Sequence, residues 1–88
     1  MIVEFLNSFS KDIDKINKKS VKSNVLKLLT LFESSHSLHG IPNTKKLVGH
    51  KSAYRIRIGD YRLGFFLEGN KVILARIVHR KDIYKVFP

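Results

Sequence analysis

The side chains best suited to chemistry are three arginines that alternate with apolar residues in the run YRIRIGDYRL, residues 54–63. Two alternating strands joined by a Gly-Asp turn are a strong signal for a β-hairpin. In that hairpin Arg57 lies opposite Arg62 and Arg55 lies opposite Gly64, so the three arginines share one face. Like charges directly opposite each other destabilise a sheet. We therefore expect this face to bind an anion, and above all phosphate, whose oxygens guanidinium groups match bidentately.

The charge of the whole chain points to a polyanionic partner. The chain has 88 residues, which we expect to form a single domain over 1–88. It contains 17 Lys and Arg against 7 Asp and Glu, for a net charge of +10. Nucleic acid, an acidic protein or a membrane surface would suit such a charge. The plainer alternative is a soluble protein that is merely basic, but the arginines are patterned and not scattered.

Several classes of protein are disfavoured by composition. The chain has no cysteine, which excludes disulfides and thiolate metal sites. No apolar run approaches the length of a transmembrane helix, and the N-terminus lacks the pattern of a signal peptide. We therefore expect a cytoplasmic protein that does not bind to a membrane.

The elements that must position the arginines follow the order β-α-α-β-β-β, which predicts an α+β fold. The predicted elements are a strand over residues 1–5, helices around 9–16 and 21–32, a loop over 34–44, and strands over 54–58, 61–67 and 71–78. We expect an antiparallel sheet with a helical hairpin packed on one face. The uncovered face would carry the arginines.

The segment after the last strand adds further candidates, but the pattern leaves its orientation open. A two-residue turn between the last two strands would place Ala75, Ile77 and His79 on the arginine face. A three-residue turn would place Arg76 and Arg80 there instead. Histidine is the only side chain that ordinarily titrates near neutral pH, which makes His79 a candidate acid or base.

A metal site is not expected. His36, His39 and His50 have no carboxylate or thiol companions at ligand spacing, and the acidic residues are few and dispersed. The chain has no Gly-rich phosphate loop, and we expect no cofactor. Lys45, Lys46 and Lys51 form a basic approach to the hairpin and are candidates for binding RNA or phosphate.

The hairpin YRIRIGDYRLG and the ending HRKDIYKVFP together resemble the RelE/ParE superfamily of toxins from type II toxin–antitoxin systems. The resemblance covers essentially the whole chain and is closest to the short RelE-type members. It implies a toxin that enters the ribosomal A site and cleaves mRNA there. It also implies a small, acidic cognate antitoxin, together with which the toxin would bind operator DNA.

The resemblance further implies an active face built from basic residues of the hairpin and from the tail. Carried onto this sequence, these residues are Arg55, Arg57, Arg62, Arg80 and Tyr84, with His79 matching a His-Arg pair found in many members. Some relatives have lysine at the strand positions. Because a guanidinium is effectively never deprotonated, Arg55 and Arg57 cannot act as a general base in place of such a lysine.

The expected chemistry is RNA cleavage by attack of the 2′-OH, without a metal ion. Arg57 and Arg62, helped by Arg55 and Arg80, would stabilise the negative charge that develops on the phosphate. His79 would act as acid or base, and Tyr84 would orient the nucleophile or stack on a base.

Two other functions remain open at this point. A ParE-type inhibitor of DNA gyrase would share the fold but would need no acid–base pair. A non-catalytic module that binds nucleic acid or antitoxin would need only the charge.

Overall fold

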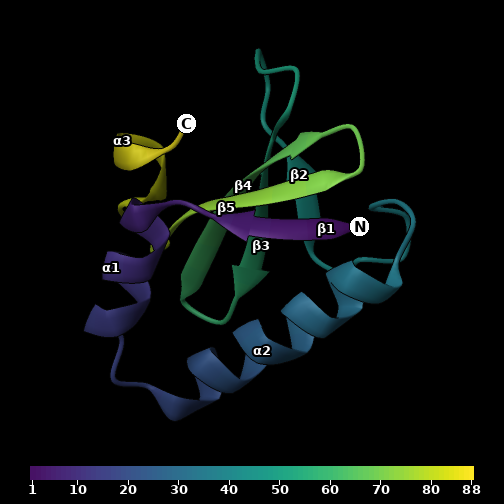
Figure 1. Ribbon diagram of the computed structural model, residues 1–88. Helices are drawn as coiled ribbons and strands as arrows, with labels where there is room; N and C mark the ends of the chain where they lie inside the picture. Colours follow the sequence, from purple (N-terminus) through teal and green to yellow (C-terminus); the bar gives the residue numbers. More distant parts are fainter.

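Five strands form one sheet in the order β1-β5-β4-β3-β2 in a computed structural model that describes residues 1–88 (Figure 1). The elements are β1 (Ile2–Phe5), α1 (Asn7–Lys15), α2 (Lys19–Ser34), β2 (Thr44–Lys46), β3 (Ala53–Ile58), β4 (Tyr61–Glu68), β5 (Lys71–His79) and α3 (Ile83–Val86). The α+β class is confirmed, and so is the predicted β3–β4 hairpin.

The hairpin has the register that its alternating pattern predicts. Ile58 pairs with Tyr61, Arg57 with Arg62, and Arg55 with Gly64. The turn residue Gly59 has a φ of 58°, a backbone conformation that glycine adopts without strain. Arg55, Arg57 and Arg62 therefore lie on one face of the sheet.

Two features of the sheet differ from the expectation. The sheet is mixed and not wholly antiparallel, because β1 pairs in parallel with β5. The short strand β2 also lies partly within the predicted loop and pairs antiparallel with β3. Both strands pair with segments that are distant in the sequence. In addition, the three polar residues of β2 show no alternation of apolar and polar residues that would indicate a strand.

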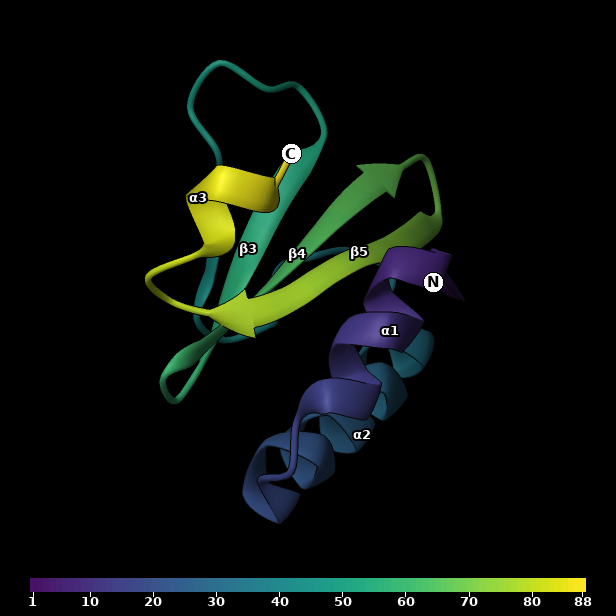
Figure 2. The ribbon, with the colours of Figure 1, turned by 90° about the vertical axis from the view of Figure 1, so that its left-hand side faces the viewer.

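Helices α1 and α2 lie on one side of the sheet and α3 lies on the other (Figure 2). The main core fills the space between the sheet and the first two helices. Its centre is the pair Phe32 and Phe65, both without solvent exposure, whose rings meet edge to face at 5.3 Å. The helices predicted around 9–16 and 21–32 are confirmed, and they bury Phe9, Val21 and Val25 here.

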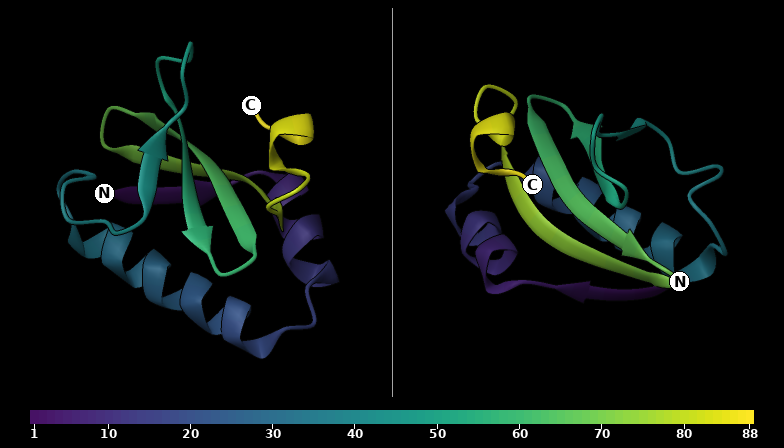
Figure 3. Two further views of the ribbon diagram at one scale, coloured as in Figure 1. Left: turned by 180° about the vertical axis from the view of Figure 1, so that it is seen from behind. Right: turned by 90° about the horizontal axis from the view of Figure 1, so that it is seen from above.

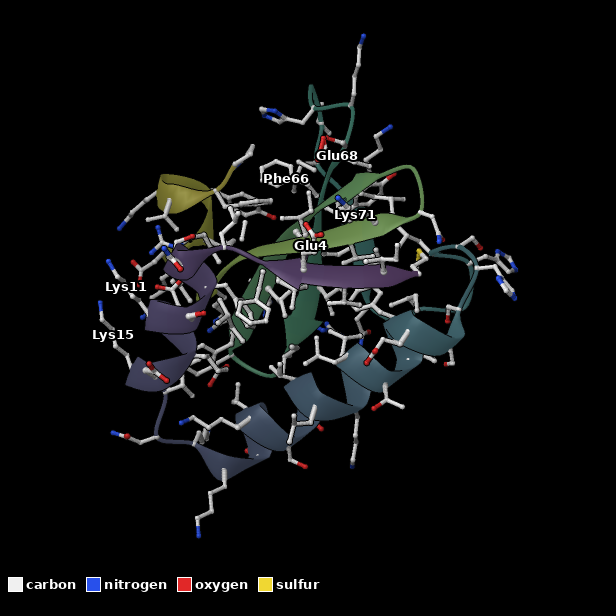
Figure 4. All side chains as sticks on the ribbon, viewed as in Figure 1. Glu4, Lys11, Lys15, Phe66, Glu68 and Lys71 are labelled. Atoms are coloured by element: carbon white, nitrogen blue, oxygen red, sulfur yellow. The ribbon has the colours of Figure 1, made fainter.

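The arginine side of the sheet is partly covered, contrary to expectation. A second core of Leu47, Ala53, Ala75, Ile83 and Phe87 lies on that side. It is completed by α3 and by the ring of Phe66, which points toward α3 (Figure 4) and lies 5.1 Å from the ring of Phe87. The tail contributes Ile83 and Phe87 to this small core, which explains why only part of this face is open.

Polar side chains of α1 cover the part of the β5 edge that β1 leaves open. Strand β1 pairs only with Lys71–Leu74. Beyond that point the Ser8 hydroxyl donates to the carbonyl of Ala75 at 2.7 Å. The buried Asp12 carboxylate accepts from the backbone N–H of Ile77 at 3.1 Å and from Nε of Arg76 at 2.6 Å. The edge is therefore satisfied without another strand.

Asp12 and Arg76 form the most buried ion pair of the chain. The hydrogen bond to Asp12 raises the pKa of Arg76 above its ordinary value, and the Coulomb attraction of the carboxylate adds to this, while burial acts in the opposite direction. Asp12 is 7% exposed, so removing its carboxylate leaves a backbone N–H and a guanidinium without their partner.

We predict that Asp12→Ala lowers the free energy of unfolding by about 3 kcal/mol, because an uncompensated charge and an unpaired N–H remain. Urea denaturation measures this loss. Asp14→Ala is the matched control, because Asp14 is exposed on the same helix and should change stability by less than about 0.5 kcal/mol. Equal effects of the two substitutions would contradict the role given to Asp12.

Candidate phosphate-binding and catalytic site

The arginines of β3 and β4 line a hollow without any acidic residue. Its volume is about 360 Å³, and its walls are Asn43, Thr44, Lys45, Arg55, Arg57 and Arg62. Lys45 belongs to the hollow because it pairs with Arg55 across the β2–β3 ladder. Every ionisable group in this hollow is a cation, as the sequence pattern predicts.

Asn43 closes the hollow next to Arg57, a role that was not predicted for it. Its φ of 61° lies in the left-handed region, which asparagine tolerates better than most residues. Its backbone carbonyl accepts from the N–H of Arg57, and its Oδ1 accepts from Nη2 of Arg57 at 3.4 Å. In the sequence, only the residue type, an asparagine directly after Pro42, could have indicated this turn.

Arg62 is held against the hairpin turn by two hydrogen bonds. Its Nη1 donates to the carbonyls of Gly59 and Tyr61, both at 2.9 Å. Burial lowers the pKa of Arg62 below its ordinary value, and the positive charges of Arg55, Arg57 and Arg80 lower it further. The guanidinium is thus fixed in place among charges that repel it.

Arg55 has an unused donor in the same region. Its Nε is buried and has no hydrogen-bond partner. Buried donors are nearly always paired in folded proteins. An anion at the hollow would supply acceptor oxygens beside this group.

None of these arginines has a carboxylate partner. The three salt bridges of the chain join Lys71 to Glu4, Arg76 to Asp12, and Lys85 to Asp82. Figure 4 shows Glu4 next to Lys71 at the β1–β5 pair, and Lys11 and Lys15 pointing away from the sheet on the outer side of α1. The acids therefore lie outside the arginine hollow.

The C-terminal tail brings two more candidates to the arginine face. Arg80 and Tyr84 lie close enough to Arg62 to affect its pKa, which the charge of Arg80 lowers and an ionised Tyr84 would raise. The backbone N–H of Arg80 donates to the carbonyl of Asp60 in the hairpin turn at 2.7 Å. Arg55, Arg57, Arg62, Arg80 and Tyr84 thus gather in one region, although the tail is remote from the hairpin in sequence.

Packing of Phe87 against Gly64 holds the tail in this position. A Cβ added at Gly64 would lie 2.6 Å from the ring of Phe87, so the ring occupies the space that a side chain would need. Ile83 and Phe87 are buried, while Tyr84 is 64% exposed. The apolar residues of the tail therefore anchor it, and Tyr84 remains available to a ligand.

The side chains of β5 follow neither of the two arrangements that the two-residue and three-residue turns predicted. The turn has two residues, Gly69 and Asn70, and Ala75 lies on the arginine side, as a two-residue turn implies. A register shift between Gly64 and Phe65 then turns Ile77 into the main core and Val78 toward the tail. Such a bulge inserts one extra residue and exchanges the two faces beyond it.

The placement of His79 that a two-residue turn predicted is therefore wrong. His79 pairs with Tyr61, which lies opposite Ile58 and packs on the main core. The rings of His79 and Tyr61 meet edge to face at 6.0 Å, and Nδ1 of His79 accepts from the backbone N–H of Lys81. Its role as acid or base stays a prediction.

The three predicted lysines divide between two places. Lys45 lines the arginine hollow, whereas Lys46, the last residue of β2, and Lys51, in the loop between β2 and β3, line another hollow along that loop. No group of three or more His, Asp or Glu side chains is placed to hold a metal ion. None of the helices combines the length and apolar character needed to cross a membrane.

Comparison with known proteins shows the family to which the chain belongs. The family model described as the ParE toxin of the type II toxin–antitoxin system parDE matches residues 3–84. The chain is 34% identical to toxin RelE3 of Methanocaldococcus jannaschii over 89 residues, which covers all of both chains. The chain belongs to the RelE/ParE family of type II toxins.

Solved structures support the fold of the toxin. The RelB–RelE antitoxin–toxin complex from Methanococcus jannaschii matches with a TM-score of 0.84 and 32% identity, covering 97% of this chain and 99% of the other. The archaeal RelE–RelB complex from Pyrococcus horikoshii OT3 matches with a TM-score of 0.74 and 19% identity, covering 93% and 97%. The second likeness concerns the fold alone.

We predict that Gly64→Ala lowers the free energy of unfolding by about 1–3 kcal/mol, because its methyl group collides with the ring of Phe87. Urea denaturation measures the loss. The same substitution in a Phe87→Ala background should cost much less, since the collision is then removed. An equal cost in both backgrounds would show that Phe87 is not the obstacle.

We also predict that Arg57→Gln stabilises the free toxin by a few tenths to about 1 kcal/mol, because it removes a like charge opposite Arg62. The gain should shrink as salt is added, since exposed charges are screened. Lys22→Gln on the exposed side of α2 is the control and should show little change. A loss of stability in Arg57→Gln at low salt would contradict the repulsion.

Proposed function

We propose that this toxin is an endoribonuclease that cuts mRNA in the ribosomal A site and so stops translation. The observation that carries the proposal is the gathering of Arg80 and Tyr84 around Arg62, beside a hollow lined only by neutral and cationic residues. Cations without carboxylate partners suit an RNA phosphate. The tail adds a phenol, which a surface that only binds anions does not need.

The proposed reaction is attack of a ribose 2′-oxygen on the neighbouring phosphorus, without a metal ion. The 2′-OH loses its proton, the oxygen–phosphorus bond forms, and the bond to the 5′-oxygen breaks as that oxygen takes up a proton. The products are a 2′,3′-cyclic phosphate and a 5′-hydroxyl. Arg57 and Arg62, with Arg55 and Arg80, stabilise the negative charge that develops on the phosphate oxygens, and such stabilisation is usually the largest contribution to catalysis.

Tyr84 completes the proposed site on the arginine side, and His79, whose ring packs on Tyr61, is the proposed acid only if it turns toward the phosphate from the end of β5. Because Nδ1 of His79 accepts a backbone N–H, a neutral ring carries its proton on Nε2. That tautomer suits His79 to protonate the leaving 5′-oxygen. The exposed ring of Tyr84 orients the nucleotide that carries the 2′-OH.

The proposed partners follow from the same charges. A small acidic antitoxin would neutralise the arginine face, and two of the similar structures are antitoxin–toxin complexes. Ribosomes and mRNA in the cytoplasm are the proposed targets, and operator DNA would be bound only together with the antitoxin. Lys45 extends the hollow along the RNA backbone, and Lys46 and Lys51 extend the basic surface beyond it.

We predict that Arg62→Ala, Arg80→Ala and Tyr84→Ala each slow cleavage of ribosome-bound mRNA, by about 10²-fold or more for the arginines, because charge stabilisation in the transition state is lost. Mapping of mRNA 5′ ends and relief of growth arrest measure the effect.

Two controls sharpen this experiment. Lys22→Ala on the exposed side of α2 should leave cleavage unchanged. An mRNA with a 2′-deoxy nucleotide at the cleaved position should resist the wild-type toxin, because it lacks the nucleophile. If folded Arg62→Ala and Arg80→Ala proteins stay fully toxic, the site is assigned wrongly.

A second candidate function is inhibition of DNA gyrase, favoured by the match to the ParE toxin model. Such an inhibitor needs no acid–base pair, so His79→Ala and Tyr84→Ala would remain toxic. Induction would cause DNA damage before translation falls, whereas an mRNA endonuclease stops translation first. Recovery of mRNA cut within A-site codons would exclude both this candidate and a non-catalytic binding module.

A further inference from the structure

We propose that a second hollow, next to the arginine hollow, receives the base of a nucleotide beside the cleaved phosphate and thereby sets codon preference. The hollow lies between the β2–β3 loop and the C-terminal tail, which Figures 1 and 2 show side by side. This inference rests on the proposed function, because it concerns the same RNA strand.

The second hollow has the size and the lining of a small ligand site. Its volume is about 350 Å³, within the range of roughly 300–1,000 Å³ that is typical of such sites. Val48, Tyr84 and Phe87 contribute apolar and aromatic surface to it, and Lys46 and His50 contribute polar groups. A nucleobase needs the same combination, with a flat face to stack and edges to hydrogen-bond.

Two residues connect the second hollow to the arginine hollow. Lys45 lines both hollows and pairs with Arg55 in the sheet. Tyr84 lines the second hollow and belongs to the tail, which the backbone N–H of Arg80 ties to the carbonyl of Asp60 in the hairpin turn next to Arg62. An RNA strand whose phosphate lies against Arg62 therefore has its neighbouring base at this hollow.

The arginine hollow would bind the RNA backbone, and the second hollow would select the base. The arginine hollow contacts phosphate, which is the same in every nucleotide and carries no sequence information. Stacking on Tyr84 tolerates any base. Lys46 can only donate a hydrogen bond, whereas His50 can both donate and accept one, so His50 is the side chain here that can match either kind of group on a base edge.

The loop that carries Val48 and His50 is held at its base. Leu47 is buried in the second core, and its N–H donates to the carbonyl of Ala53 at 2.9 Å. The N–H of His50 then donates to the carbonyl of Leu47, around Gly49 with its φ of 82°. These contacts make a tight turn, on which Val48 is 92% exposed. Figure 3 shows the loop extending beyond the sheet.

The test compares cleavage of mRNAs that differ in single bases of the A-site codon, using ribosomes, wild-type toxin and the variants His50→Ala and Val48→Ser. We expect the ratio of kcat/KM between preferred and disfavoured codons to fall about fivefold or more in His50→Ala. Val48→Ser should raise KM for all codons, because it removes apolar surface.

His39→Ala is the matched control, since His39 is an exposed histidine of another loop, and it should keep the wild-type preference. A trinucleotide with 2′-deoxyribose cannot be cut, and NMR titration with it should shift the ring signals of His50 and Tyr84.

Three results would overturn the proposal. Unchanged codon ratios in His50→Ala, with normal cleavage, would refute the base site and leave the proposed function standing. Unchanged ratios together with weaker antitoxin binding by His50→Ala would assign the hollow to an antitoxin side chain instead. Failure of wild-type toxin to cut any ribosome-bound mRNA would remove the proposed function and this inference with it.

Discussion

The contact between the ring of Phe87 and the backbone of Gly64 is the constraint on which the candidate site depends. Only glycine leaves room for the ring at this point of β4. Gly64 also borders the register shift between β4 and β5. Gly64, which has no side chain, therefore has two roles. It leaves room for the ring of Phe87, and it lies at the bulge beyond which the side chains of β5 point to opposite faces of the sheet. Without both, Arg80 and Tyr84 would have no fixed relation to Arg62.

The fold uses polar and apolar contacts in different places to hold this arrangement. On the helix side, Asp12 binds the backbone just beyond the register shift and pairs with Arg76. On the other side, a small apolar core ties the tail and the β2–β3 loop to the sheet. The end of β5 is therefore fixed from both sides, which is the kind of support that a preorganised site needs.

The arginine face opposes stability in the free toxin. Arg55, Arg57, Arg62 and Arg80 have no carboxylate partners, and the pKa of Arg62 is lowered by burial and further by the positive charges of the other three arginines. A bound polyanion would relieve that repulsion, whether it is an RNA phosphate or an acidic antitoxin. The same charge that disfavours the free state therefore favours both proposed partners, which makes competition between them a natural consequence.

The sequence by itself determined the α+β class, the register of the β3–β4 hairpin and the shared face of its arginines, because a two-residue turn and strict alternation act between neighbouring residues. It could not determine that β1 pairs in parallel with β5, or that three polar residues form β2, because both pairings join distant segments. Only the tertiary structure decided that Arg80 faces the arginines while His79 faces Tyr61. A single extra residue in the ladder reverses the faces beyond it, and packing between remote segments decides where that residue lies.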